Sequence, residues 1–586
     1  MSLFAELRRR KLLRVAVAYL AGSWLLIQVA ETLFPVYDIG DGAIRAIVAV
    51  LVIGFVPLVV IAWMYRFTPV GLKKQSDIDQ DNIVAGPGGR LPDDIVLAVL
   101  PFDNLSSDPE TQYFSDGISE EIIQRLSRGA GLTLIGRTSS FQFRGERKAE
   151  AARALNCSHV LDGSVRRAAG RARINAHLVE TSTGTTLWSD RYDSSLEDMF
   201  AVQDEISESI AGALDRAFSS FSSLVDDPEV YDLYLRSSLK SYAPDELRSS
   251  IGLLELATER APKFAEAWAR LAYSRAWLRF YEPYAIRAAS ALKVRHDAEK
   301  ARELDPGNIE ALVADLFVLA PFGQFKEAYD ILDQVRQSPG TGDGKKYIGW
   351  HLRHFGFIRQ SLLEDERIYL SNPLDPMCAN IAGLARMAAG RVEEAVPVFE
   401  SLMASNPEMT FPFTNLLRAK TLLKDWAGVD KLLQLSKERP LREFEDGLSF
   451  VRAKHNGSQE SIDRWRKDFE ARVESSGSVD VARLAYTAHL GLVDEAYAAA
   501  ERASLGPDGS EHDIMGADGY RSSMLFQARM PEIRNDPRFV NLCARLGLVD
   551  FWVSSNLWPD CTDDLPYDFK SACKNALGTP IEEFRF

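Results

Sequence analysis

Two long apolar runs dominate the hydrophobic pattern at the beginning of the chain. Residues 15–37 contain a single charged residue, Glu31, and residues 46–65 contain none. A helix of about 20 apolar residues is long enough to cross a bilayer. The pattern therefore predicts a two-helix transmembrane hairpin within residues 1–72, with spans at about 15–37 and 44–65.

Basic residues flank this predicted hairpin on both sides. Five lie within residues 8–14, and Arg66, Lys73 and Lys74 follow the second span. The positive-inside rule then places both ends in the cytoplasm, so we expect the soluble domains to face the cytoplasm. One alternative is a cleaved signal peptide, against which the length of the first run argues. The other is the opposite topology, with the domains facing the periplasm.

After the predicted hairpin, a polar Gly/Pro-rich stretch at residues 73–94 is typical of a linker. Short β-type runs then alternate with helical patterns, and the last three runs are separated only by turn signals. The predicted strands lie at 94–102, 132–136, 159–168, 172–180 and 185–193; one predicted helix begins at Asp108, and two more lie at 146–155 and 196–214. This order predicts that residues 95–218 form an α/β domain with a mixed sheet.

A proline repeat marks the second half of the chain. Five prolines recur at steps of 33 or 34 residues, namely Pro306, Pro339, Pro373, Pro407 and Pro440. That period is the tetratricopeptide period, in which each unit is a pair of antiparallel helices. Within the unit that ends at Pro407, Gly383 and Ala395 allow a close approach of the paired helices, and Phe399 fills the groove. The pattern predicts a solenoid over residues 229–505, whose concave face binds protein partners.

Residues 506–586 follow the array, and we expect them to form a helical cap or tail. Their aromatic residues Phe551, Trp552 and Trp558 would cover the last repeat.

The composition of the chain argues against two classes of protein. A formal net charge of −15 without a basic tract beyond the first residues argues against nucleic-acid binding. Five scattered cysteines fit a reduced compartment and argue against a disulfide framework.

Six acidic residues within residues 101–122 raise the question of an active site: Asp103, Asp108, Glu110, Asp116, Glu120 and Glu121. Asp108, Pro109 and Glu110 have the layout of a helix start. Phe114, Ile118, Ile122 and Leu126 follow at helical spacing, which predicts an apolar face with the later acids pointing away from it. We therefore interpret these acids as a capped amphipathic helix, without a catalytic or metal-binding role.

Three further stretches have a possible chemical role and a simpler explanation. Residues 339–346, PGTGDGKK, lack the spacing and the hydroxyl of a phosphate-binding loop, so we interpret them as a turn between repeats. His351 and His354 share a helix face but lack companion ligands, so we expect packing histidines. Arg166, Arg167, Arg171 and Arg173 fall at a predicted hairpin and would be either solvated or near anionic lipid headgroups. No catalytic, cofactor-binding or metal-binding residue is predicted.

Four motifs carry a family resemblance. LPFDNLSSDPETQYFSDGISEEII, RTSSFQFRG, HVLDGSVRR and LWSDRYD together resemble the amino-terminal-type domain of TolB. With the apolar start, they are similar to bacterial membrane proteins that carry tetratricopeptide repeats, some of which are linked to nucleotide cyclases. The resemblance covers residues 1–216 and implies an inner-membrane protein.

The predicted fold class is therefore α+β multidomain: a transmembrane hairpin, a TolB-like α/β domain and an all-α solenoid. We expect a non-enzymatic scaffold without a cofactor, acting in signalling or complex assembly. The lipid bilayer and protein partners are its expected contacts. A cyclase-related sensor whose α/β domain binds a small ligand is the alternative. The sequence gives no prediction of the oligomeric state.

Overall fold

A computed structural model divides the chain into two compact units, Met1–Arg90 and Leu91–Phe586. The structure describes residues 65–68, 71–74 and 95–579, with gaps at 107, 109–110, 131, 169, 197, 215–226, 239–242, 283, 320–323, 339–342, 408, 410, 437–444 and 506–519. In the first unit, β1 (Tyr65–Thr68) pairs antiparallel with β2 (Gly71–Lys74). The predicted spans at 15–37 and 44–65 otherwise lie outside the described residues. Among the helices that are described, none is long and apolar enough to cross a membrane.

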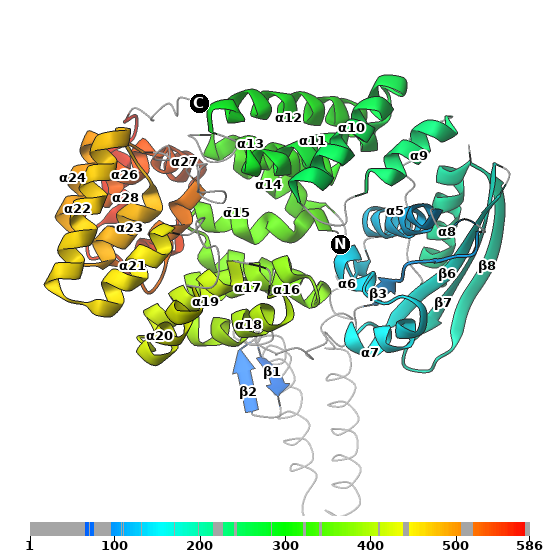
Figure 1. The fold of residues 1–586 in the computed structure, drawn as a ribbon, viewed down its shortest axis with the longest axis horizontal. Helices are drawn as coiled ribbons and strands as arrows, with labels where there is room; N and C mark the ends of the chain where they lie inside the picture. The colour runs from blue at the N-terminus through cyan, green and yellow to red at the C-terminus, as the bar shows by residue number, and fades with distance from the viewer. Residues whose placement is uncertain are drawn as a thin grey trace, which may run out of the picture. The chain divides into compact units, whose positions relative to one another are not determined.

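The second unit begins with a mixed sheet (Figure 1). Its strand order is β5-β3-β6-β7-β8, and β4 pairs with β6 off this path. The first three strands are parallel, and β6, β7 and β8 form an antiparallel meander. The bounds are β3 Val96–Val99, β4 Asp103–Asn104, β5 Thr133–Leu134, β6 His159–Ala168, β7 Arg171–Glu180 and β8 Thr186–Ser195. The predicted mixed sheet and its three-strand meander are thus present.

Helices cover the two faces of this sheet unequally. One face packs against α5 (Gln112–Ala130) and α8 (Met199–Ala213), whose Ile118, Ile122 and Ile206 are fully buried. The other face is covered at β3 and β5 by α6 (Arg137–Ser140), a 3₁₀ turn η3 (Gly145–Glu150) and α7 (Ala151–Ala154), through a small apolar cluster. Over β7 and β8 the outward-pointing residues are exposed or half-buried.

Residues 228–502 form eight helical pairs in the part of the chain that the structure describes. The helices are α9 Pro228–Arg236, α10 Pro244–Arg260, α11 Ala265–Leu278, α12 Tyr284–Leu304, α13 Ile309–Leu319, α14 Phe325–Gln337, α15 Ile348–His354, α16 Ile358–Ser371, α17 Pro376–Ala388, α18 Val392–Ser405, α19 Phe411–Leu422, α20 Trp426–Leu435, α21 Glu445–Asn456, α22 Gln459–Ser476, α23 Val481–His489 and α24 Val493–Arg502. Shorter elements among them are η4 Arg279–Tyr281, η5 Asp343–Tyr347, β9 Ser478–Val479 and β10 Ser504–Leu505.

The positions of the prolines and small residues follow the predicted repeat. Pro306, Pro373 and Pro407 lie in turns that follow the second helix of a pair. In the α17–α18 pair, a Cβ atom on Gly383 would come within 2.6 Å of the Phe399 ring. Phe399 and Ala395 are fully buried. Only glycine therefore permits this approach, and the predicted close packing of this pair is confirmed.

The segment after the array contacts the last helical pair, as the predicted cap would, but its aromatic residues lie elsewhere. Its elements are η8 Tyr520–Phe526, α25 Glu532–Asn535, α26 Phe539–Arg545, α27 Leu548–Ser555, η9 Asp560–Asp564 and α28 Phe569–Asn575. The α25 end does contact the last pair, where His489 Nδ1 lies 3.0 Å from Glu532 Oε2. Trp552, however, donates its indole N–H to the Phe355 carbonyl at 3.0 Å, just after α15. The prediction that Phe551 and Trp552 cover the last repeat is therefore wrong, because they pack on α14 and α15.

This tail covers the helices that were expected to form a binding face. The first helices of consecutive pairs contact one another, and η8 lies against three of them, α15, α17 and α23. None of the described side chains of α11, α13, α15, α17, α19 and α23 is exposed. Where η8 packs on α15, α17 and α23, the chain itself therefore covers part of the predicted concave binding face.

Candidate functional site

The α5 helix differs from the prediction in the burial of its polar face. An amphipathic surface helix should expose one face, but Ser115, Ser119 and Glu121 are buried as fully as the apolar stripe. The sheet covers one side of α5, and α9, the first helix of the array, covers the other. The prediction that Glu121 belongs to a solvated face is therefore wrong.

The beginning of α5 is also displaced. The predicted helix start at Asp108 would place Pro109 in the first turn, yet the helix begins at Gln112. The Asp108 carbonyl accepts hydrogen bonds from the backbone N–H and the hydroxyl of Thr111, and Asn104 Nδ2 donates to the same carbonyl at 3.2 Å. Pro109 and Glu110 lie outside the described residues. Asp108 and Thr111 thus form a turn before the helix.

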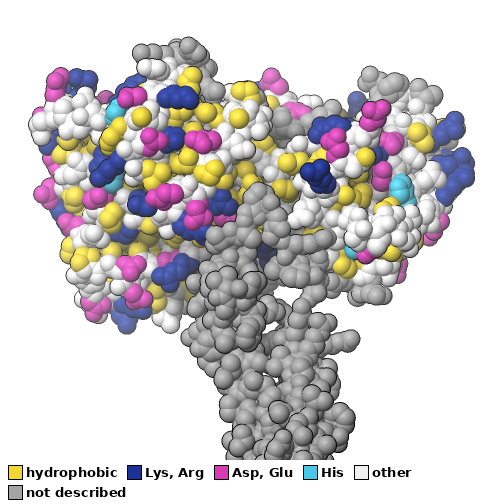
Figure 2. Space-filling view, turned by 90° about the horizontal axis from the view of Figure 1, so that it is seen from below, with side chains coloured by type: hydrophobic (Ala, Val, Ile, Leu, Met, Phe, Trp, Pro, Cys, Tyr) yellow, Lys and Arg dark blue, Asp and Glu magenta, His cyan; other side chains and the backbone are white. Residues whose placement is uncertain are grey.

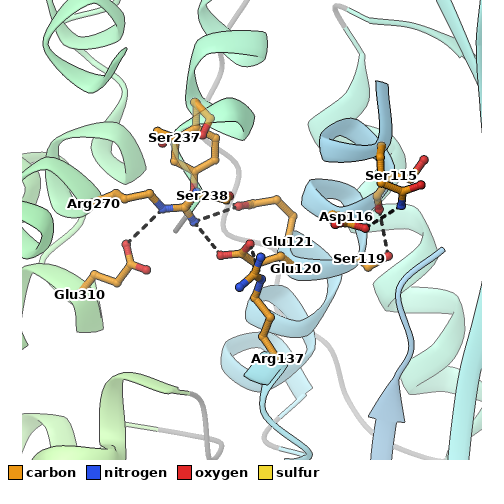
Figure 3. A network of polar contacts seen from close by, with 12 residues as sticks. Ser115, Asp116, Ser119, Glu120, Glu121, Arg137, Ser237, Ser238, Arg270 and Glu310 are labelled. Carbon is orange, nitrogen blue, oxygen red and sulfur yellow. Dashed lines mark hydrogen bonds and ion pairs between the residues drawn. The ribbon is translucent and has the colours of Figure 1, made fainter. Parts of the chain in front are cut away.

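A buried polar network joins α5 to the array (Figure 3). Tyr234 on α9 donates its hydroxyl hydrogen to Glu121 Oε1 at 2.8 Å. Arg270 on α11 places Nη2 3.5 Å from Glu121 Oε1, and its guanidinium carbon lies 4.2 Å from the centre of the Tyr234 ring. The Arg270 side chain is only 5% exposed, so a buried cation is held by a carboxylate and an aromatic face at once.

Two further carboxylates complete this network, and they come from opposite sides of it. Glu120 lies 3.5 Å from Arg270 Nη2 and 3.0 Å from Nε of Arg137 on α6. Glu310 at the start of α13 lies 3.9 Å from Arg270 Nε. Arg270 is thus the shared cation for acids from the α/β domain and from the next repeat. We call these six residues the junction network: Glu120, Glu121, Arg137, Tyr234, Arg270 and Glu310.

Burial controls the electrostatics of the junction network. It raises the pKa of Glu121, although Arg270 and Arg125 act in the opposite direction. It also raises the pKa of Tyr234 well above its ordinary value. Burial raises the pKa of Glu310 to about 7, with Arg270 again opposing. Glu310 retains 29% exposure, so water screens part of this effect. Arg270 therefore opposes the effect of burial on the pKa of both Glu121 and Glu310.

Two other contacts hold the α/β domain on the array. Asp232 on α9 accepts hydrogen bonds from Tyr113 Oη at 2.5 Å and Arg167 Nη1 at 2.7 Å. Farther along the array, the Leu374 N–H donates to Ser139 Oγ at 3.2 Å, in the turn before α17. The α/β domain therefore contacts the array at α9 to α13 and again at Leu374. Arg167, predicted to be solvated or near lipid headgroups, is instead part of this contact.

The other stretches singled out in the sequence have structural surroundings. His351 and His354 are buried, and Trp350 packs edge-on against both rings. Lys345 and Lys346, interpreted from the sequence as part of a turn between repeats, are also buried, and Lys346 Nζ lies 3.7 Å from Asp375 Oδ2. Burial lowers the pKa of Lys345 to about 8. Among the residues that the structure describes, no group of three His, Cys, Asp or Glu side chains is placed to hold a metal ion.

No local signal in the sequence identified Arg270, Tyr234 or Glu310. They lie on helices whose patterns are ordinary for the repeat, and their partners on α5 are more than 100 residues away. The acids of α5 were noticed in the sequence, but their partners were not. The candidate site is therefore a buried joint between two parts of the chain, in which two guanidinium groups and one phenol contact three carboxyl groups.

Comparisons with known proteins give partial likenesses. No family model matches the chain. A protein of Rhizobium meliloti (strain 1021) named "Putative adenylate cyclase 3" is 48% identical over 164 residues, which is 27% of this chain and 28% of that protein. Among solved structures, human IFIT1 dimers with m7Gppp-AAAA and with PPP-AAAA align at a TM-score of 0.34 and 15% identity. These alignments cover 52% of this chain and 76% or 77% of IFIT1.

Proposed function

We propose that this protein is a protein-binding scaffold in which the α/β domain and the helical array act as one rigid body. The observation that carries this proposal is a shared core. Tyr231 and Leu235 of α9 and Leu271 of α11 belong to the same apolar cluster as Ile118 of α5. A partner bound to one part would therefore be held at a fixed position relative to the other.

The outer helices of the array carry the surface on which we expect partners to bind. Leu256 on α10, Leu292 on α12 and Leu363 on α16 are 48%, 70% and 42% exposed. Figure 2 shows acidic, basic and apolar side chains interspersed over the face in view, with no wide field of one sign. Such a mixed surface is typical of protein contacts, whereas phosphate backbones require clustered basic residues.

Site-specific photocrosslinking tests the scaffold proposal. A photoreactive amino acid replaces Leu292 or Leu363 in the full-length chain, expressed in its own cells. We expect discrete adducts with other proteins, because both side chains are exposed. The matched control carries the same amino acid at Leu577, which is 52% exposed in the tail and lies outside the array and the sheet. If neither array position yields adducts beyond those of an ultraviolet-free sample, the scaffold proposal fails.

The bilayer is a second part of the proposal and rests on residues 1–72 alone. Anchoring by the predicted hairpin would raise the effective concentration of the array for membrane-bound partners. Alkaline phosphatase fused after Phe586 reports the side of the membrane. We expect no phosphatase activity, in line with cytoplasmic domains. An active fusion would assign the domains to the periplasm.

The match to the putative adenylate cyclase favours one alternative function. This chain spans only 28% of that relative, so a shared regulatory part, without the catalytic part, would explain the match. In that case the α/β domain would sense a small ligand on behalf of a cyclase. Thermal unfolding of the purified chain with and without nucleotides tests this alternative. A nucleotide-dependent rise of the midpoint would favour the sensor, since a ligand stabilises the state that binds it.

A further inference from the structure

The outer edge of the sheet is open at β8. This strand is the terminal one in the sheet order, it is ten residues long, and it contains no proline. Among the described elements, β7 pairs with the inner edge of β8, and α8 packs on one of its faces. The Arg191 N–H donates a hydrogen bond to Oδ1 of the neighbouring Asp190 at 2.7 Å, which shows that the N–H points away from β7. By two-residue periodicity the Ser189 and Asp193 backbone groups share that direction, and the Asp193 carbonyl accepts a hydrogen bond from Arg171 Nη2 at 3.0 Å.

The uncovered face beside this edge has a regular arrangement of polar side chains. The register aligns Arg166, Arg173 and Asp193 in one row across β6, β7 and β8. The next row consists of Ser164, Asn175 and Arg191. Residues aligned in this way have their side chains on the same face. Arg173 is 43% exposed and Asp193 is 36% exposed, so this face is accessible to a partner.

The charges on this face are unbalanced. Asp193 accepts hydrogen bonds from both Arg171 and Arg173. Arg166 lies opposite Arg173, and like charges in this position destabilise a sheet. The guanidinium groups of Arg166 and Arg191 have no ion-pair partner within the described part of the chain. Four arginines thus face Asp193, while Asp162 in the row beyond Ser164 is paired with Lys148, although the chain as a whole carries −15.

We propose that β8 accepts an extended acidic segment of a protein partner as an additional strand. Backbone hydrogen bonds along the free edge would provide affinity, as in other strand-addition complexes. In the added strand, the residue opposite Arg191 would point to the arginine face, and so would every second residue from it. Acidic residues at these positions would lie nearest to Arg191 on β8, and farther from Arg173 on β7 and Arg166 on β6. A carbonyl of the added strand would replace the Asp190 carboxylate at the Arg191 N–H.

This proposal rests on the proposed scaffold function and specifies one binding surface for it. Figure 2 agrees with it, since Lys and Arg side chains gather at the right-hand edge, the side on which Figure 1 shows β8. Anionic lipid headgroups are a competing occupant of the same arginines. A strand is favoured because the arginines flank an edge with outward-pointing backbone groups, which a headgroup does not need.

A labelled peptide of about ten residues with alternating Glu and Val is the probe, and fluorescence anisotropy with the solubilised full-length chain is the measurement. We expect saturable binding that weakens with added salt. Arg166→Glu with Arg191→Glu should weaken binding at least about tenfold, because each substitution reverses an unpaired charge. Ser189→Pro should weaken it similarly by removing an outward N–H, at a strand edge where proline is tolerated. Arg248→Glu on α10, where Arg248 is 60% exposed, is the matched control and should leave binding unchanged.

Three results would overturn the proposal. The first is no binding of the acidic peptide, and the second is equal binding of an alternating Lys and Val peptide. The third is loss of binding in the arginine variant but not in Ser189→Pro, together with displacement by phosphatidylglycerol vesicles, which would assign the face to lipid. Crosslinks at Leu292 or Leu363 that persist in the arginine variant would show that the scaffold function stands independently.

Discussion

At the scale of single residues, Arg270 carries the largest share of the interactions at the joint. It is the cation that Glu120, Glu121 and Glu310 share, and it stacks on Tyr234. A buried ion pair adds little stability by itself, but removing one partner leaves the other charge buried and uncompensated. The consequence of losing Arg270 should therefore exceed the value of any one of its contacts.

We predict that Arg270→Ala destabilises the chain by about 3–5 kcal/mol. Arg270→Lys should recover only part of this loss, because an ammonium group lacks the planar surface that lies on Tyr234. Urea denaturation followed by circular dichroism measures both effects. Arg248→Ala is the control, since Arg248 is an exposed partner of Asp245 and should change stability by less than about 1 kcal/mol. Similar losses for the two alanine variants would refute the shared-cation role.

Substitutions of Gly383 and Gly252 test the close packing of the α17–α18 pair. Gly383→Ala should destabilise the chain by about 1–3 kcal/mol, because the new methyl group would overlap the Phe399 ring. Gly252 lies on α10, where an added Cβ meets no atom within 4 Å. Gly252→Ala should therefore stabilise the chain by up to about 1 kcal/mol. Denaturation midpoints at unchanged slope give both values, and effects of the same sign would contradict the packing argument.

Local patterns predicted the apolar residues better than the charged ones. Phe114, Ile118, Ile122 and Leu126 are buried as their spacing predicts. Glu121 is buried too, although its position in the pattern predicts exposure. The difference arises because α5 is covered twice, and its second cover comes from α9 and α11, far along the chain. A sequence pattern records which face is apolar, but it does not show when the polar face meets a matching set of charges.

At the scale of elements, the strands and repeat helices follow from local signals, whereas the tail's position does not. Turn residues and alternation define β6, β7 and β8, and the proline period defines the helical pairs. The aromatic residues of α27 indicate that it must be buried, but not where. Its position depends on Phe355 and Phe357 after α15, which pack against Phe551. Such long-range packing has no signature within the tail.

We predict that Trp552→Ala loosens this tail from the array. The substitution removes a fully buried side chain and its hydrogen bond to the Phe355 carbonyl, at a cost of about 3–5 kcal/mol. Hydrogen exchange should quicken in residues 520–579 and in α15 and α17, which the tail covers. Trp558→Ala is the control, because Trp558 is only half-buried and donates to Asn556, two residues away. Unchanged exchange in α15 would show that the tail does not protect the array.

At the scale of the whole molecule, the chain from Leu91 onward forms one compact unit whose apolar core crosses the predicted boundary between residues 218 and 229. Its buried titratable groups therefore report on one cooperative structure. The buried acids and the buried histidines have opposite effects on how stability depends on pH. Burial raises the pKa of Glu310 and of Asp365 to about 7, and it lowers the pKa of His351 to about 3 and that of His354 well below its ordinary value.

The sign of each contribution follows from proton linkage. An acid with a raised pKa binds its proton more tightly when folded, so its stabilisation is lost as pH rises through about 7. A histidine with a lowered pKa binds protons more tightly when unfolded, so stability falls as pH drops below about 6.5. Between about pH 5 and 6.5 the two effects oppose each other, and above pH 6.5 the contribution of the histidines fades and that of the acids dominates.

We therefore predict that the free energy of unfolding changes little between pH 5 and 6.5 and falls by about 1–2 kcal/mol between pH 6.5 and 8. Urea denaturation at constant ionic strength measures it. Glu310→Gln should remove about half of the decline, since an amide cannot ionise near Arg270. The exposed pair of Lys326 and Asp330 supplies the control, because Asp330→Asn should leave the profile unchanged. A free energy that rises between pH 6.5 and 8 would mean that Arg270 holds Glu310 ionised throughout, and that the junction network depends on charge more than on burial.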